Sequence, residues 1–439
     1  MASVTTDRTS CDTETLPKRP CALFWDESFL WGVMAWRALR EAGLPFDLLR
    51  AEDIRSGALS RYRMIFVPGG WASNKLIALG EEGCEEIRLF VEAGGSYLGI
   101  CGGAGMAMDD GIGLMPVGRK PSRQRVPSFS GGVRISPADH MLWQGIEAPV
   151  FTVWWPSQFR IGDHDTRVLA TYEEARLDAF SSDVRVEDGL SHGWPALEER
   201  YGILLDPTRL RGEPAVLEGL YGNGKVILSM LHFDTPGDRN GAVVLRNLWR
   251  CLTLSDLSVP PVNSDVQKDC SRPDLSPEIL ASIEEIDTGV TDLITTGESN
   301  FLWYWRNPFL LLWRRGVRGL EYSTLAVMIA EIRKRLDHYR CGYPDVRPGL
   351  PEFIDPVRLQ MDLMEIRRQI TPFVAKAQRL LVRERFYLQK APLSPLACAD
   401  EEIQRLRQEL FASAMSHGGD FKRLIDAVDR LLYSLIRLL

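Results

Sequence analysis

The residue types best placed to do chemistry are a cysteine at a glycine-rich turn and a histidine two residues before an aspartate. Cys101 lies in a Gly-Ile-Cys-Gly-Gly segment, 99–103, directly after an apolar run. Glycines two positions before and after the cysteine are typical of a nucleophile elbow, a sharp turn that projects the central side chain above the end of a strand. His232 and Asp234 follow a second mainly apolar run, 225–231. Together the three residues predict a thiol activated by an imidazole that a carboxylate orients.

The elements that must position these residues follow a regular alternation. Short buried strands are predicted at 21–25, 46–49, 63–67 and 96–100, and helices at 29–42 and about 81–93. Strands separated by helices of this length predict a mostly parallel sheet with helices on both faces, and the ligand sites of such sheets lie at the carboxyl ends of the strands. Several residues directly follow predicted strands and are therefore expected to share one rim of the sheet: Asp26, Glu27, Gly69, Gly70 and Cys101.

Between about residues 116 and 214 the pattern changes to shorter strands and many turns. We expect this part, which includes the aromatic run Val150–Trp155, to extend the sheet and to form one wall of the site. A hairpin-type turn at Gly222–Gly224 leads into the strand before His232, and a helix predicted at about 240–252 closes the domain.

The chain divides at residues 255–277, a segment rich in Ser, Pro and Asp that indicates a linker. Residues 1–19 are predicted to form a disordered polar leader, and residues 20–254 an α/β domain. From 278 to 439 apolar residues recur at helical spacing, notably at 322–339, 356–388 and 421–438. This second part predicts an α-helical bundle of about four to six helices.

Composition limits the classes of protein to consider. With 45% hydrophobic and 25% charged residues, the 439-residue chain has an ordinary globular composition, and its net charge of −7 argues against general nucleic-acid binding. The eight cysteines show no paired metal-ligand spacing, so we expect no metal, no cofactor and no disulfide framework. The leader lacks the apolar core of a signal peptide, and no stretch approaches the ~18 apolar residues of a membrane span. We therefore expect a cytoplasmic protein without a transmembrane segment.

Three motifs together resemble the class-I glutamine amidotransferase-like superfamily: Phe66–Gly70, Gly99–Ala104 and Ser229–Asp234. Within it, the chain is most similar to the amidotransferase-like domain at the N-terminus of some biotin–protein ligases, a likeness that the stretches 167–172 and 221–229 also carry. The resemblance covers about residues 20–254 and implies a flavodoxin-like, amidotransferase-type fold. The superfamily usually has His-Pro-Glu where this chain has His-Phe-Asp at 232–234.

The resemblance assigns a role to each motif residue. Cys101 is the expected nucleophile, His232 the base and Asp234 the orienting acid, while the backbone N–H groups of Gly70 and Gly102 form the oxyanion hole. These roles predict an enzyme, an amide hydrolase or glutamine amidotransferase-like protein that works through a thioester on Cys101. Further residues at the same rim are candidates for contact with a small-molecule amide: Gly69, Asp26, Glu27 and Trp155.

Two alternatives remain open at this point. In the first, the domain is a catalytically silent ligand-binding or scaffold protein, and the helical region recruits a protein partner. In the second, the aromatic and leucine-rich stretch 301–313, next to several arginines, associates with a membrane surface. The same stretch equally fits burial in the bundle or docking between domains. The substrate and the oligomeric state are not specified by the sequence.

Overall fold

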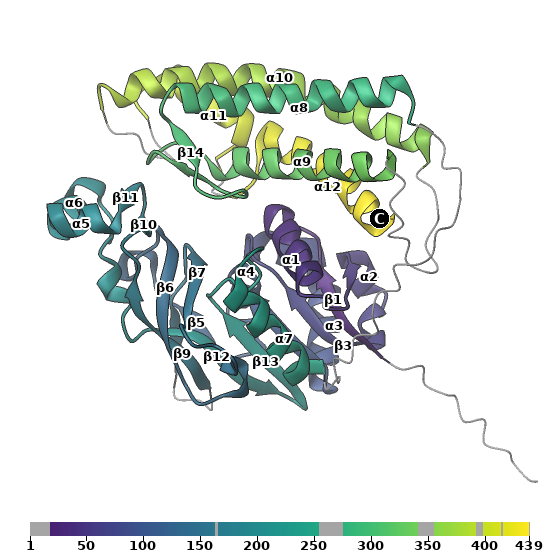
Figure 1. The fold of residues 1–439 in the computed structure, drawn as a ribbon, viewed down its shortest axis with the longest axis vertical. Coiled ribbons are helices and arrows are strands. Elements are labelled where there is room, and N and C mark those ends of the chain that lie inside the picture. Colours follow the sequence, from purple (N-terminus) through teal and green to yellow (C-terminus); the bar gives the residue numbers. More distant parts are fainter. Residues whose placement is uncertain are drawn as a thin grey trace, which may run out of the picture.

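The computed structural model describes residues 18–162, 166–253, 275–340, 355–391, 398–413 and 416–438 (Figure 1). The predicted leader lies outside these residues apart from its last two, and the first strand already begins at Arg19. Most of the predicted linker also lies outside them, and its last residue, Pro277, begins a helix. None of the described helices is long and apolar enough to cross a membrane.

A single large sheet forms the α/β part. Its parallel half has the strand order β2 (Asp47–Leu49), β1 (Arg19–Phe24), β3 (Tyr62–Val67), β4 (Ser96–Ile100) and β13 (Gly224–Ser229). The antiparallel half continues with β12 (Pro214–Tyr221), β9 (Arg167–Ala175), β6 (Phe129–Pro137), β10 (Phe180–Ser181) and β11 (Val184–Arg185), and β7 (Val150–Trp154) pairs with β6. A separate small pair joins β5 (Val117–Arg119) to β8 (Phe159–Ile161).

The sheet is therefore mixed, not mostly parallel as predicted. The strands between residues 129 and 185 follow one another without the long helical crossovers that parallel pairing requires, and they pair antiparallel, as does β12 with β9 and β13. The expectation that this part extends the sheet is confirmed. The predicted strands of the parallel half are also present, with bounds that differ by one or two residues.

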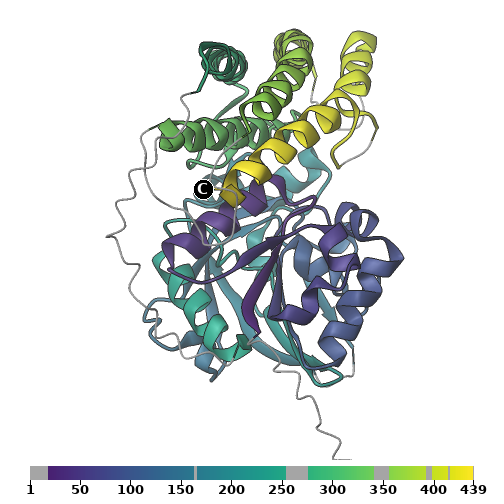
Figure 2. The ribbon, with the colours of Figure 1, turned by 90° about the vertical axis from the view of Figure 1, so that its right-hand side faces the viewer.

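Helices cover both faces of the parallel half (Figure 2). Helices α1 (Phe29–Glu41) and α7 (Arg239–Thr253) pack together on one face, and α2 (Ala51–Arg55), α3 (Ala72–Glu92) and α4 (Gly102–Met106) pack together on the other. Helix α3 begins earlier than predicted because it continues across a kink at Gly80, where φ is 64°. Two short helices, α5 (Val186–His192) and α6 (Trp194–Tyr201), follow β11.

The second part of the chain contains five described helices: α8 (Pro277–Ser299), α9 (Leu320–Arg340), α10 (Pro356–Leu388), α11 (Glu401–Phe411) and α12 (Gly419–Leu438). Between α8 and α9 the chain is not helical, contrary to our expectation. The stretch 301–313 instead forms a hairpin of β14 (Trp303–Trp305) and β15 (Leu311–Trp313). Aromatic residues favour strands, and the Asn307 side chain holds the turn by accepting from the N–H groups of Phe309 and Leu310, both at 2.9 Å.

The helical part lies over the rim at which the parallel strands end (Figure 1). Asp429 of α12 accepts a hydrogen bond from Trp25 Nε1 at 2.8 Å and pairs with Arg50 at 3.1 Å. Glu331 of α9 is fully buried and accepts from Arg37 Nε of α1 at 2.9 Å. The hairpin adds a third contact, because Arg306 donates to the Ser130 hydroxyl and carbonyl at 2.8 and 2.9 Å.

Candidate functional site

Cys101 stands on a sharp turn between β4 and α4. Its backbone has φ 53° and ψ −105°, a conformation that non-glycine residues rarely adopt and that costs about 1–3 kcal/mol. Its N–H donates to the Ser229 carbonyl at 2.7 Å, so neighbouring strand β13 fixes the position of the turn. The side chain is partly exposed, and its sulfur lies 3.7 Å from the Trp154 carbonyl oxygen. The elbow predicted from the glycine spacing is present.

The glycines around Cys101 leave no space for side chains. A Cβ on Gly102 would lie 1.9 Å from the Gly70 carbonyl oxygen, and a Cβ on Gly103 would lie 2.0 Å from the Val67 carbonyl oxygen. A Cβ on Gly99 would lie 2.6 Å from the Gly103 carbonyl oxygen. The turn can therefore form only if the chain has glycine at these three positions.

His232 and Asp234 form a buried pair directly behind this turn. The His232 Nδ1 and an Asp234 carboxylate oxygen are 2.9 Å apart, and neither side chain is exposed. The shorter aspartate thus reaches the imidazole. The backbone N–H of His232 donates to the Thr152 carbonyl of β7 at 2.8 Å, which fixes the histidine against that strand. Burial lowers the pKa of His232, but the charge and hydrogen bond of Asp234, with a smaller contribution from Cys101, raise it to about 9.

The second ring nitrogen of His232 is available for proton transfer. His232 Nε2 is buried and has no hydrogen-bond partner among the described residues. The Cys101 sulfur is close enough to the imidazole to raise the pKa of His232. The Trp31 ring covers the imidazole with a centroid distance of 5.0 Å, and a Cβ on Gly69 would lie 3.2 Å from His232 Cε1. Gly69 therefore lies against the imidazole.

The two N–H groups predicted to form an oxyanion hole lie close to each other. A Cβ on Gly102 would lie 3.0 Å from the Gly70 nitrogen, so the backbones at the two positions are in contact. Gly70 has φ 110°, which only glycine adopts readily. Neither N–H group donates to another group within the described part of the chain. Both backbone donors are thus left without an acceptor in the described part of the chain.

The acidic residues predicted to touch a ligand are engaged elsewhere. Asp26 accepts from the Ala51 N–H at 2.7 Å and pairs with Arg50 at 3.0 Å. Glu27 pairs with Lys422 of α12 at 2.9 Å and accepts from the Asn74 amide at 3.2 Å. Both carboxylates therefore hold α2, α3 and α12 at the end of β1.

Trp155, in contrast, stands at the site. Its φ is 53°, another strained value for a residue other than glycine. Its ring lies between those of Trp31 and Trp313, at centroid distances of 6.2 and 5.5 Å. Because Trp313 belongs to β15, the hairpin of the helical part contributes a wall to the site.

Two basic residues that we did not predict also lie near Cys101. Lys75 is fully buried, donates to the Ser28 hydroxyl, and its pKa is lowered to about 7 by burial, although the carboxylates of Glu27, Asp26 and Asp429 act against this. Arg125 lies in the loop before β6, and its Nε is buried without a partner among the described residues. Burial and Arg119 lower the pKa of Arg125, whereas Cys101 raises it.

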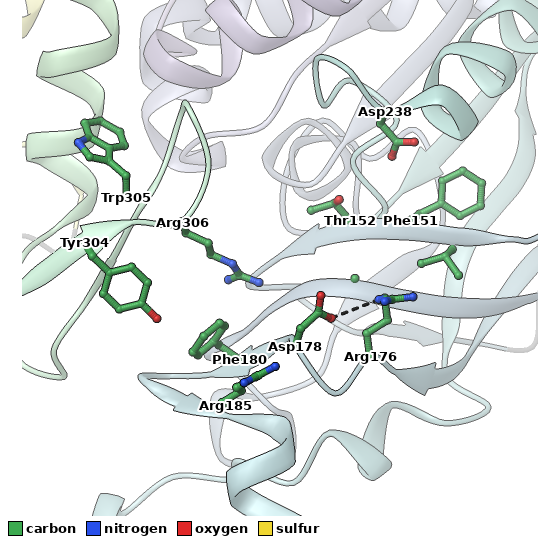
Figure 3. Close-up of a pocket in the computed structure, with 12 residues that line it drawn as sticks. Phe151, Thr152, Arg176, Asp178, Phe180, Arg185, Asp238, Tyr304, Trp305 and Arg306 are labelled. Atoms are coloured by element: carbon green, nitrogen blue, oxygen red, sulfur yellow. Dashed lines mark hydrogen bonds and ion pairs between the residues drawn. The ribbon is translucent and has the colours of Figure 1, made fainter.

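A hollow of about 600 Å³ lies between the hairpin and the strands β6, β7 and β10 (Figure 3). Tyr304, Trp305 and Arg306 approach it from the hairpin, and Arg176, Asp178, Phe180 and Arg185 line the opposite side (Figure 3). Arg176 is paired with Asp178 at 3.2 Å. At least part of the positive charge in this hollow is therefore already neutralised by the protein.

One group of potential metal ligands occurs among the described residues. One atom each of His140, Glu218 and Cys251 lies within 4.8 Å of the others. The Lys225 ammonium is 3.5 Å from Glu218 and 3.4 Å from the Cys251 sulfur, so a cation of the protein already faces these groups. This group belongs to β12, α7 and the loop after β6, not to the Cys101 turn.

No known protein family matches the chain, and no curated protein matches it. Among solved structures, it is similar to a GMP synthase subunit-like protein from Thermoplasma acidophilum, with 15% identity over 53% of this chain and 92% of that one and a TM-score of 0.34. A cytoplasmic protein from Salmonella typhimurium LT2 gives 14% identity over 53% and 99%, with a TM-score of 0.35. A beta-galactosidase from Bacillus circulans gives 12% over 54% and 31%, with a TM-score of 0.33. At these TM-scores the likeness supports no functional assignment.

Proposed function

We propose that this chain is a cysteine amidohydrolase or acyl-transfer enzyme of the class-I glutamine amidotransferase-like superfamily, most similar to the biotin–protein ligase N-terminal domain. One observation carries the proposal. A buried His232–Asp234 pair at 2.9 Å presents an unpartnered Nε2 beside a cysteine held in a strained elbow. The flavodoxin-like, amidotransferase-type fold is part of the same proposal.

The proposed reaction has two steps, transfer of the acyl group to Cys101 and then to water, and His232 acts in both. The Cys101 thiolate attacks the amide carbonyl carbon, and the developing oxyanion accepts hydrogen bonds from the Gly70 and Gly102 N–H groups. The His232 imidazolium then donates its Nε2 proton to the leaving amine, and a thioester remains on Cys101. Water, deprotonated by His232, attacks the thioester and releases a carboxylic acid and the free thiol. Asp234 holds the imidazole in the orientation that both proton transfers require.

The test is the pH dependence of alkylation of Cys101 by iodoacetamide, followed by peptide mass spectrometry. An imidazolium next to the sulfur stabilises the thiolate, so His232→Ala is expected to move the Cys101 profile upward by roughly 1–3 pH units. Cys251, another partly exposed cysteine of the same protein, is the internal control and is expected to keep its profile.

A Cys101 profile that does not respond to His232→Ala would overturn the proposed dyad. That outcome would favour the catalytically silent binding or scaffold protein instead. A second measurement addresses turnover: Cys101→Ser is expected to abolish amide hydrolysis while leaving the thermal unfolding temperature unchanged. A Cys101→Ser variant with full activity would exclude the thioester route.

A further inference from the structure

A cavity of about 540 Å³ lies between the tryptophan pair Trp154–Trp155 and the segment 310–317 that follows the hairpin turn. Cys101 is not one of its lining residues, but Trp154 connects the two, because its carbonyl oxygen is 3.7 Å from the Cys101 sulfur. Most of its lining is apolar or aromatic, including Ile203, Leu310 and Trp313. A cavity of this size and character can enclose the body of a small organic molecule.

The charged residues of this cavity all have the same sign. Arg306 and Arg315 line it, and no carboxylate is among its lining residues. Arg125 stands at its edge, with Nη2 at 3.4 Å from the hydroxyl of Ser122, which also lines the cavity. None of the three guanidinium groups forms an ion pair with a carboxylate of a described residue.

These arginines form no ion pair among the described residues, although the charges of Asp178 and Asp183 raise the pKa values of Arg306 and Arg315 against the effect of burial. Burial lowers the pKa of Arg306 to about 10 and also lowers the pKa values of Arg125 and Arg315, yet a guanidinium stays protonated at neutral pH. A partly buried, unpaired cation is unfavourable, and an anion beside it offsets the cost. Arg306 also lines the hollow in Figure 3, where Arg176 forms an ion pair with Asp178 at 3.2 Å.

Backbone strain marks the same cavity. Trp155 and Ser182 both line it, and they have φ values of 53° and 58°. Strained residues of this kind cluster at binding and catalytic sites, where the surrounding structure holds them. The strain, the single sign of charge and the neighbouring thiol are independent observations at one place.

We propose that this cavity binds the substrate of the Cys101 site, and that the substrate is an amide with an apolar body and a free carboxylate, of the N-acyl amino acid type. The apolar body lies against Trp155 and Trp313, and the carboxylate is held by the arginines, whose planar guanidinium matches a carboxylate in two parallel hydrogen bonds. This inference rests on the proposed function for the amide, whereas the binding of the apolar carboxylate stands without it.

Calorimetry on the full-length Cys101→Ala protein tests the binding without any turnover. The probes are N-acyl amino acids with benzoyl, phenylacetyl or octanoyl groups, each compared with its neutral C-terminal amide. We expect at least one acid to bind, and its neutral amide to bind about ten-fold or more weakly because it lacks the charge-assisted hydrogen bonds. If no acid binds, or if acids and amides bind equally, the inference is wrong.

Two matched pairs of variants locate the binding. Ser128→Asp places a carboxylate in the lining of the cavity and is expected to weaken binding about ten-fold or more relative to the unsubstituted Ser128 protein. Ser128→Asn, whose side chain has the shape of aspartate but no charge, is expected to keep the affinity within about three-fold. Arg125→Met is expected to weaken binding, and Arg123→Met, an exposed arginine of the same loop, is not. Equal affinities within both pairs would place the ligand elsewhere and refute the inference.

The alkylation experiment separates this inference from the proposed function. If the affinities differ within the variant pairs as expected but His232→Ala leaves the alkylation profile of Cys101 unchanged, the binding site is supported and the proposed enzymatic function is refuted. If His232→Ala shifts the alkylation profile of Cys101 but no N-acyl amino acid binds, the Cys101–His232 dyad is supported and the proposed specificity for a carboxylate is refuted.

Discussion

Replacing Asp234 by asparagine perturbs the candidate site at one atom. The amide has the shape of the carboxylate and keeps an oxygen that accepts from His232 Nδ1, but it removes the negative charge. Both side chains are fully buried, so little solvent screens the charge that is lost. Asp234→Asn therefore measures what the carboxylate does for the imidazole, with the packing of the site unchanged.

The structure gives the size and the pH range of the effect. Burial opposes the charged imidazole, yet Asp234 raises the pKa of His232 from 6.5 to about 9. This difference corresponds to about 3 kcal/mol of stability. Because the pKa is raised in the folded chain, the stabilisation is complete below about pH 6.5 and is lost as the pH rises through about 9.

The assay is urea denaturation of wild type and Asp234→Asn at pH 6 and pH 10. We expect the wild-type advantage in the free energy of unfolding to be larger at pH 6 than at pH 10 by about 3 kcal/mol. Titrating groups that do not interact with His232 are common to both proteins and cancel in this difference, and a Cys101→Ala background removes the neighbouring thiol. The control is Asp206→Asn, which removes the carboxylate that accepts from the Thr208 N–H at 2.9 Å. Its cost should be the same at both pH values.

A wild-type advantage that is equal at pH 6 and pH 10 would refute this reasoning. It would mean that His232 is neutral in the folded chain at pH 6, and that Asp234 only orients it. A direct reading comes from the NMR titration of His232, which should move from about 9 in the wild type to a lower pH in Asp234→Asn.

Three further predictions concern the elements around the site. Gly102→Ala, whose Cβ would lie 1.9 Å from the Gly70 oxygen, should abolish selective alkylation of Cys101, whereas Gly105→Ala in the same helix meets only Ala72 at 3.5 Å and should keep it. Lys75→Met should raise the free energy of unfolding more at pH 6 than at pH 10. Burial lowers the pKa of Lys75 to about 7, so the stability associated with its neutral form is complete above the unfolded pKa of 10.5 and is lost as the pH falls through 7. The variant has no such loss at pH 6. Glu331→Ala, which leaves Arg37 and Arg335 without their buried partner, should cost roughly 3–5 kcal/mol by chemical denaturation.

Local patterns predict the parallel half of the sheet well because each of its strands lies in a short, mainly apolar run, and Pro68 and Gly102 follow directly after two of these runs or one residue later. The nucleophile elbow is predictable for the same reason, since close contacts such as that between Gly102 and Gly70 admit only glycine. The hairpin 303–313 is not predicted, because its aromatic and leucine residues fit a buried helix equally well until the turn at Asn307 is considered.

The electrostatic partners at the site could not be predicted from the sequence. Asp26 and Glu27 follow a strand end, as ligand-binding acids do, but Arg50 and Lys422 neutralise them, and Lys422 comes from a helix about 400 residues further along the chain. Arg125 and Trp313 have no motif spacing relative to Cys101. Their proximity arises from how the loop before β6 and the hairpin fold onto the rim, and this tertiary arrangement has no local signature.

The two ends of the rim therefore differ in a way that indicates where a ligand enters. Above β1, the acids are paired with bases of α2 and α12, and the helical part covers the strand end. Beside β7, Arg306, Arg315 and Arg125 form no ion pair with a carboxylate of the described residues. Arg306 and Arg315 line a mainly apolar cavity, Arg125 stands at its edge, and Trp154 connects this cavity to the Cys101 sulfur. The ion pairs of Asp26, Glu27 and Asp429 hold the helical part in place, whereas the excess of positive charge at the cavity favours an anion. The helical part thus does more than cover the site: it contributes Arg306, Trp313 and Arg315 to the lining of the cavity in which we propose that the ligand binds.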